Sequence, residues 1–155
     1  MIQRVQSIYL SLIILLSLLF LKGSYLTFSD STGSVIKITF SGIIKSTGGQ
    51  GSELLEKLLP LSAFIIVIPV LSLITIFLYK NRKIQMCFAS IGIMIAAGLI
   101  LVSGYYSFVV SSRYSVSIIA GAKMAIPVAI LVLSIMAYRG IRKDDRLVKS
   151  YDRLR

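Results

Sequence analysis

The sequence predicts an all-α membrane protein: a four-transmembrane-helix bundle with a small extracytoplasmic β-hairpin or loop between the first and second helices. Hydrophobic residues make up 56% of the chain and charged residues 15%, and the mean hydropathy is +0.88. These values lie far from those of soluble domains. The apolar residues also form uninterrupted blocks instead of recurring at helical or strand periods, which indicates lipid as their surroundings. We therefore expect one membrane domain over residues 1–155.

Four apolar blocks predict the membrane spans, at about residues 5–21, 58–79, 84–110 and 118–138. The first block follows Arg4 and contains no charge. A cleaved signal peptide ending at Gly23 is the competing interpretation, but Leu21 would then occupy position −3, where a small residue is needed. The third block is longer than the ~20 residues that a bilayer requires, so we expect it to tilt or protrude.

Four residues within these predicted spans differ from their apolar neighbours. Pro69 removes an internal hydrogen bond and should kink the second helix, and Pro127 lies in the outer half of the fourth. Lys123 would lie about 7 to 8 Å along a helix that starts near residue 118. It could extend to the outer interface or act as a functional buried cation. Cys87 is expected to be a small buried packing residue.

The connection over residues 22–57 is polar and rich in glycine. Two runs of alternating character, 25–28 and 35–40, flank a segment of turn-forming residues, which predicts a β-hairpin. Residues 46–52 have the composition of a flexible loop, because glycine and serine bury too little surface to offset the entropy of ordering.

Lysine and arginine counts predict the orientation, because short basic segments resist translocation. Eleven of the 17 basic residues lie at the N-terminus, in the turn at residues 80–83 and in the tail at residues 139–155. The other six lie in the two remaining connections and at the outer ends of the spans. We expect a bacterial cytoplasmic (inner) membrane protein with both termini in the cytoplasm.

The basic tail at residues 139–155 can be drawn as a helix with Leu147, Tyr151 and Leu154 on one face. Its default partner is the anionic headgroups of the inner leaflet, to which basic residues near the surface are attracted. Docking on a cytoplasmic protein or on RNA is the alternative. No nucleic acid is expected, because no aromatic platform for base stacking accompanies the charges.

The chain has no histidine, and the predicted spans contain no Asp or Glu. Imidazole-ligated haem, histidine-bound zinc and histidine general-base catalysis are therefore excluded. Asp144 and Asp145 are adjacent and flanked by basic residues, so we expect local ion pairing and no divalent-cation site. The sequence predicts no catalytic residues, no metal site and no cofactor: the protein is not expected to be an enzyme.

Small residues recur at every fourth position in two spans: Gly121, Ala125 and Ala129 in the fourth, and Gly92 and Ala96 in the third. Such stripes allow helix backbones to approach closely in a membrane. We expect the third and fourth helices to pack on each other, although a contact with another protein would need the same pattern.

Three segments carry a resemblance to a known family: the opening MIQRVQSIYL (residues 1–10), the junction YKNRKIQ (79–85) and the ending IRKDDRLVKSYDRLR (141–155). With them, essentially the whole chain resembles a family of uncharacterised four-pass inner-membrane proteins from Bacteroidetes, catalogued as a domain of unknown function. The resemblance implies topology and a cytoplasmic-membrane location, but no activity. It directs attention to the middle turn and the tail.

The leading hypothesis is a non-enzymatic accessory or structural subunit of a larger membrane complex, with a membrane-protein partner of unknown identity. Its candidate partner-binding residues are Asn81, Arg82, Gln85, Arg153 and Arg155. The alternative is a small transporter or channel for an apolar or cationic solute, with Pro69 and Pro127 breaking the helices.

Overall fold

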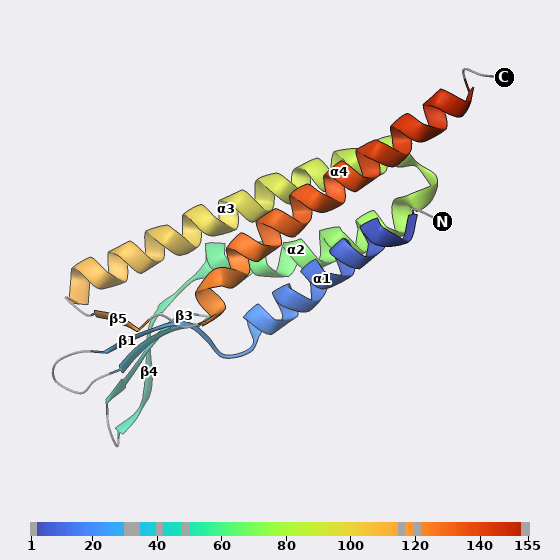
Figure 1. Ribbon diagram of the computed structural model, residues 1–155. Coiled ribbons are helices and arrows are strands. Elements are labelled where there is room, and N and C mark those ends of the chain that lie inside the picture. Colours follow the sequence, from blue (N-terminus) through green and yellow to red (C-terminus); the bar gives the residue numbers. More distant parts are fainter. Residues whose placement is uncertain are drawn as a thin grey trace.

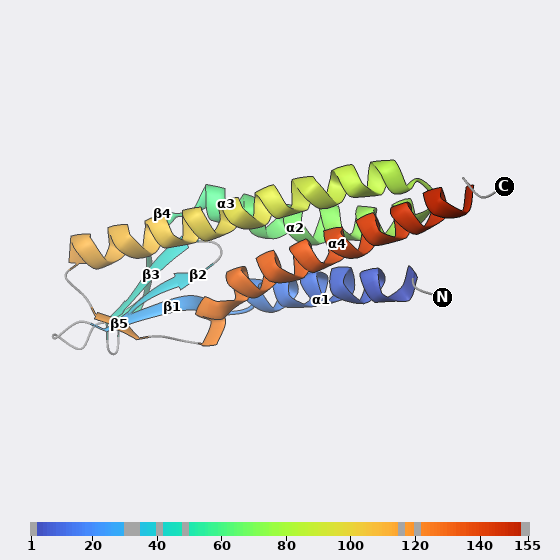
Figure 2. The same cartoon turned by 45° about the horizontal axis from the view of Figure 1, so that its top comes forward.

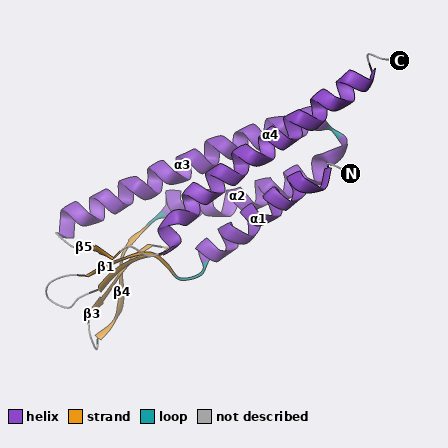
Figure 3. Cartoon of the chain, viewed as in Figure 1, coloured by secondary structure: helices purple, strands orange, loops and turns teal. Residues whose placement is uncertain are grey.

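The computed structural model of the chain describes residues 3–29, 35–39, 42–47, 50–114, 117–119 and 122–152. In chain order, the elements are α1 (Gln3–Leu21), β1 (Ser24–Ser29), β2 (Val35–Thr39), β3 (Gly42–Thr47), β4 (Gln50–Lys57), α2 (Leu59–Phe77), η1 (Leu78–Lys80), α3 (Arg82–Tyr114), β5 (Ser117–Ile119), η2 (Ala122–Ala125) and α4 (Ile126–Asp152). The four long helices form an elongated bundle, and the strands gather at one end of it (Figures 1 and 3).

The four long helices pack side by side in a ring, in which α1 contacts α2 and α4 and α3 contacts the same two helices. The N- and C-terminal ends of the chain lie at the end of the bundle opposite the sheet (Figures 1 and 2). Among the described residues, three helical segments are long and apolar enough to cross a membrane: Leu59–Phe77, Arg82–Arg113 and Lys123–Val148. The apolar segment of α1, Val5–Leu21, is shorter.

Each helix turns one stripe of residues inward, and these four stripes together are called the seam. Their buried members are Gln6, Leu10, Ile13, Ser17 and Phe20 on α1, Leu61, Ile65, Ile68, Ser72 and Thr75 on α2, Gln85, Ala89, Ala96, Leu99 and Ser103 on α3, and Ile130, Ser134, Ala137, Ile141 and Asp144 on α4. They are spaced by four and three residues or by their sum. This is the heptad spacing of helices that pack at a small crossing angle.

Five of the seam residues carry a hydroxyl group, and four of these hydroxyls donate a hydrogen bond to a carbonyl oxygen of their own helix. The acceptors are the carbonyl oxygens of Ile14 for Ser17 (2.8 Å), Leu71 for Thr75 (2.7 Å), Ile100 for Ser103 (3.0 Å) and Ile130 for Ser134 (2.8 Å). Such bonds satisfy a buried hydroxyl without a partner on another helix. No buried side-chain nitrogen or oxygen among the described residues lacks a hydrogen-bond partner.

The strands form a five-stranded antiparallel sheet in the order β4-β3-β2-β1-β5. The predicted hairpin is present as β1 and β2, and Ile36 and Ile38 are buried while Lys37 between them is exposed. A register shift in β1 next to Ser24 accompanies the burial of two consecutive residues, Tyr25 and Leu26. The sheet therefore has an apolar face that can pack on the bundle.

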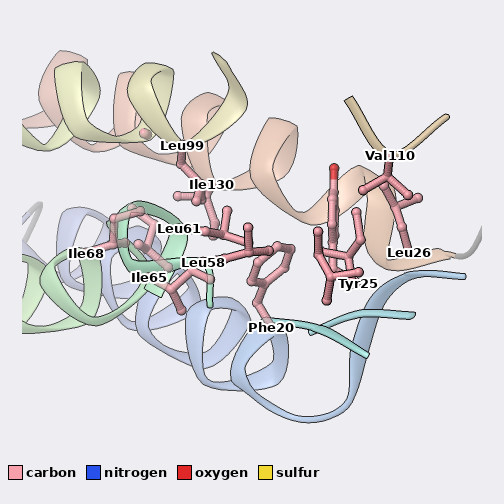
Figure 4. Packing of buried hydrophobic residues seen from close by; sticks show 14 of the residues in the cluster. Phe20, Tyr25, Leu26, Leu58, Leu61, Ile65, Ile68, Leu99, Val110 and Ile130 are labelled. Carbon is pink, nitrogen blue, oxygen red and sulfur yellow. The ribbon is translucent and has the colours of Figure 1, made fainter. Parts of the chain in front are cut away.

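The apolar core runs without a break from the bundle into the sheet (Figure 4). Phe20 at the end of α1 contacts Tyr25 of β1, with ring centroids 4.9 Å apart. At 1.5 Å per residue α3 is about 50 Å long, and its last turns lie beyond the other helices along the sheet, where Val110 joins the same core. The third helix, which was expected to tilt or protrude, therefore extends beyond the other helices and over the strands.

Four helices and a small β-element were predicted correctly, but two boundaries were wrong. Residues 46–52 were expected to be a flexible loop, whereas 46–47 and 50–52 belong to β3 and β4, and residues 48–49 lie outside the described residues. The fourth helix begins at Ile126 instead of 118, because residues 117–119 pair with β1 as β5. It then continues up to Asp152, so the helix drawn for the tail is confirmed as far as this residue.

These boundaries change the surroundings of several residues. Pro127 lies in the first turn of α4, a position that tolerates proline, so it does not interrupt a helix; Pro69 does lie inside α2. Lys123 lies in η2, outside the long helix, and its ammonium group donates to the carbonyl oxygen of Lys22. Gly23, at φ 80°, makes the turn beside it, a backbone conformation that suits glycine.

One packing prediction was also wrong. Cys87 is exposed instead of buried. Gly92 lies against α2, because a Cβ atom added at this position would be 3.4 Å from a methyl group of Leu71. Ala96 is fully buried in the seam, and α3 and α4 do pack on each other. Gly121 lies outside the described residues.

The packing of the seam predicts that a larger side chain destabilises the protein at a buried seam position but not on the outer surface of the bundle. Ala96→Leu places three further carbon atoms in a site with no exposed surface and should lower the free energy of unfolding by about 1–3 kcal/mol. Ala63→Leu is the matched control, because Ala63 is exposed on α2. Unfolding of the purified variants in mixed micelles, followed by circular dichroism, measures the difference; equal stabilities would contradict the packing.

Candidate functional site

A group of polar residues from several helices gathers at the end of the bundle where both termini lie. We call Gln6, Ser7, Tyr79, Arg82, Gln85 and Asp144 the polar end cluster; with Ile141 they line a cavity of about 20 Å³. They come from α1, η1, α3 and α4, so segments far apart in the sequence meet here. A cavity of this size has room for about one water molecule.

Gln6 and Asp144 join the first and last helices. Both side chains are 6% exposed, and the amide nitrogen of Gln6 donates to a carboxylate oxygen of Asp144. Gly140 makes this possible, because a Cβ atom at that position would lie 3.0 Å from Cγ of Gln6. A buried carboxylate is costly without donors, so this contact supports the position of Asp144 in the seam.

Gln85 joins the two helices of the tight turn. Its side-chain amide donates to the carbonyl oxygen of Thr75 over 3.1 Å, and its backbone amide donates to the carbonyl oxygen of Asn81 over 2.9 Å. Thr75 belongs to the last turn of α2, where carbonyl groups lose their helical partners. The side chain of Gln85 therefore caps the C-terminal end of α2, and its backbone amide forms a hydrogen bond in the first turn of α3.

The arrangement offers hydrogen bonding and one buried carboxylate. Among the described residues there is no group of three or more Cys, Asp or Glu side chains that could hold a metal ion. The ion pair between described side chains, Arg113 with Glu56 at 3.9 Å, lies at the sheet end, and both of its side chains are more than half exposed. Such an exposed pair contributes little to stability.

The sequence matches the DUF4293 family, a domain of unknown function, over residues 2–154. The chain belongs to this family. The resemblance inferred from the opening, the middle junction and the ending is confirmed at this level. A comparison with curated proteins gives no match.

In this DUF4293 member, the structure separates the five candidate partner-binding residues. Arg82 and Gln85 line the cavity of the polar end cluster, whereas Asn81 is exposed on the turn. Arg153 and Arg155 lie outside the described residues. Partner binding by these residues stays a prediction, but Gln85 is buried and engaged in the turn, so Asn81 is the more accessible of the two.

Gln6 and Asp144 were missed by the sequence analysis. Asp144 was expected to pair with its basic neighbours, because the tail was treated as separate from the fourth span. The buried stripe of α4 continues without a break from Ile130 through Ile141 to Asp144. Extending the seven-residue spacing beyond the last apolar block would have placed the carboxylate on the inner face.

The contact between Gln6 and Asp144 predicts energetic coupling of the first and last helices. Gln6→Leu and Asp144→Leu should each lower the free energy of unfolding by about 1–3 kcal/mol, since each leaves a buried polar group without its partner. The double variant should recover part of that loss, and Ser11→Leu on the exposed side of α1 should be neutral. Additive losses in a double-mutant cycle would show that the contact contributes nothing.

Proposed function

We propose that this protein crosses the inner membrane four times, with both termini in the cytoplasm, and serves as a non-enzymatic accessory subunit of a larger membrane complex. The observation that carries the proposal is the division of the bundle: a closed interior of apolar and internally bonded residues, and a charged end built by both termini and the middle turn. Such an interior holds helices together, and the charged end remains available to a partner.

Two features support a fourth crossing by α1. At 1.5 Å per residue its 19 residues extend about 28 Å, close to the ~30 Å of a hydrocarbon core. Its outer side presents large exposed apolar side chains, among them Val5, Ile8, Leu12, Leu15 and Leu18. These side chains match the exposed apolar surfaces of α2 and α3, as expected of helices in lipid.

The division between the two ends supports the proposed orientation. The sheet and the polar end cluster lie at opposite ends of the bundle (Figure 1). Arg139, Arg142, Lys143 and Arg146 extend α4 beyond its apolar part, next to the N-terminus of α1. A concentration of positive charge of this kind favours the cytoplasmic side.

The orientation is tested by cysteine labelling in intact cells. In a Cys87→Ser background, Lys37→Cys on the exposed side of β2 should react with a membrane-impermeant maleimide, whereas Arg142→Cys should react only after lysis. Both positions are exposed, so accessibility to solvent is matched. The reverse pattern would invert the topology, and equal labelling of both would rule out a sheet and a tail on opposite sides.

The accessory role is tested by affinity purification from native membranes in mild detergent, with mass spectrometry. A stoichiometric protein partner should accompany the full chain. The comparison is a chain that ends at Val148, because removal of residues from 139 onward would also take the buried Ile141 and Asp144. We expect the shortened chain, and Asn81→Ala in the turn, to lose at least tenfold of the partner; a partner-free full chain would contradict the role.

A further inference from the structure

A groove runs between α1 and α4 on the outside of the bundle, next to the polar end cluster. It has a volume of about 390 Å³ and is lined by Val5, Gln6, Tyr9, Met136, Arg139, Gly140, Lys143 and Asp144. Gly140 contributes no side chain, so the backbone of α4 forms part of the groove between two cations. One part of the lining is therefore apolar and the other is positively charged.

The two cations of the groove are Arg139 and Lys143. They are four residues apart on a helix, so their Cβ atoms are about 5–6 Å from each other on one face. Both side chains are exposed, and neither forms an ion pair with a described side chain. The carboxylate of Asp144, which also borders the groove, accepts its hydrogen bond from Gln6. An anion of about the size of a phosphate group can approach both cations together.

Neighbouring charges increase the attraction for an anion. Arg142 and Arg146 continue the basic face of α4 and, with Arg139, Lys143 and Leu147, line a second hollow of about 500 Å³. Like charges three and four residues apart on a helix repel one another, so a bound counter-charge is favoured. The second hollow has Leu147 as its apolar lining residue and lacks the apolar wall of the groove.

The apolar wall indicates what kind of anion fits. Met136 lies one turn of α4 before the cations, and Tyr9 lies one turn of α1 after Val5, so both continue the groove toward the apolar part of the bundle. Arg139 directly follows Tyr138, the last residue of the charge-free apolar block of α4. In a membrane this position is the boundary between hydrocarbon and headgroups, where basic pockets between helices bind acidic lipid headgroups.

We propose that the groove between α1 and α4 is a binding site for an anionic phospholipid. The phosphodiester lies between Arg139 and Lys143, and one acyl chain lies along Tyr9 and Met136. The inference rests on the proposed membrane location, but not on its orientation or on a protein partner. Charge complementarity and the adjoining apolar wall together distinguish a lipid from a free phosphate ion, which would use the cations alone.

The test is native mass spectrometry of the full chain in a neutral detergent, titrated with dioleoylphosphatidylglycerol, dioleoylphosphatidylcholine or inorganic phosphate. Arg139→Gln/Lys143→Gln should weaken phosphatidylglycerol binding about 30-fold, about fivefold for each charge at an anionic site. Arg142→Gln/Arg146→Gln is the matched control, because it removes the same charge from the same helix outside the groove, and it should change binding less than threefold. Helix content by circular dichroism shows that each variant folds, and the two single variants serve if the double variant does not.

Equal losses in the two double variants would overturn the proposal, because binding would then follow total charge. Equal affinity for phosphatidylcholine, or displacement of the lipid by inorganic phosphate, would also overturn it. The purified chain is used alone, so failure of partner capture does not affect this result, and loss of lipid binding leaves the accessory role standing.

Discussion

The seam is the constraint on which the rest of the structure depends. Four helices place buried residues at four- and three-residue intervals, which keeps one stripe of each helix facing its neighbours over the length of the bundle. Small residues such as Ala96 and Ala137 let the helices come close, and the hydroxyl groups between them bond to their own helices. The interior is consequently packed throughout, and the features that could contact other molecules lie at its ends and on its outer surface.

The two ends of the bundle are closed in different ways. At one end the apolar face of the sheet joins the core formed by the last turns of α1 and α3, through Phe20, Tyr25 and Val110. At the other, side-chain amides link neighbouring helices: Gln85 caps α2, and Gln6 contacts Asp144. Apolar packing fits where strands supply a broad surface, whereas directional hydrogen bonds fit where helix termini leave backbone groups without partners.

The same turns of α4 contribute residues both to the buried seam and to the charged surface of the bundle. Ile141 and Asp144 face the seam, while Arg139, Arg142 and Lys143 face outward. A helical period separates these two sets even though they are neighbours in the sequence. The same helix can therefore anchor the bundle and present a positive surface, which is the basis for both the accessory role and the lipid site proposed above.

The sequence by itself determined the class of the protein: long apolar blocks are helices because a buried backbone must bond within its own segment, and Ile36 and Ile38 alternate with polar residues as in a strand. It also indicated the family and the basic end. Only the tertiary structure decided that residues 42–47 and 50–57 are strands, since β3 and β4 are stabilised by pairing with neighbours and have little signal of their own. The partnership of Gln6 with Asp144, 138 residues apart, likewise depends on α1 and α4 being adjacent in the ring, because local patterns carry no information on which helices become neighbours.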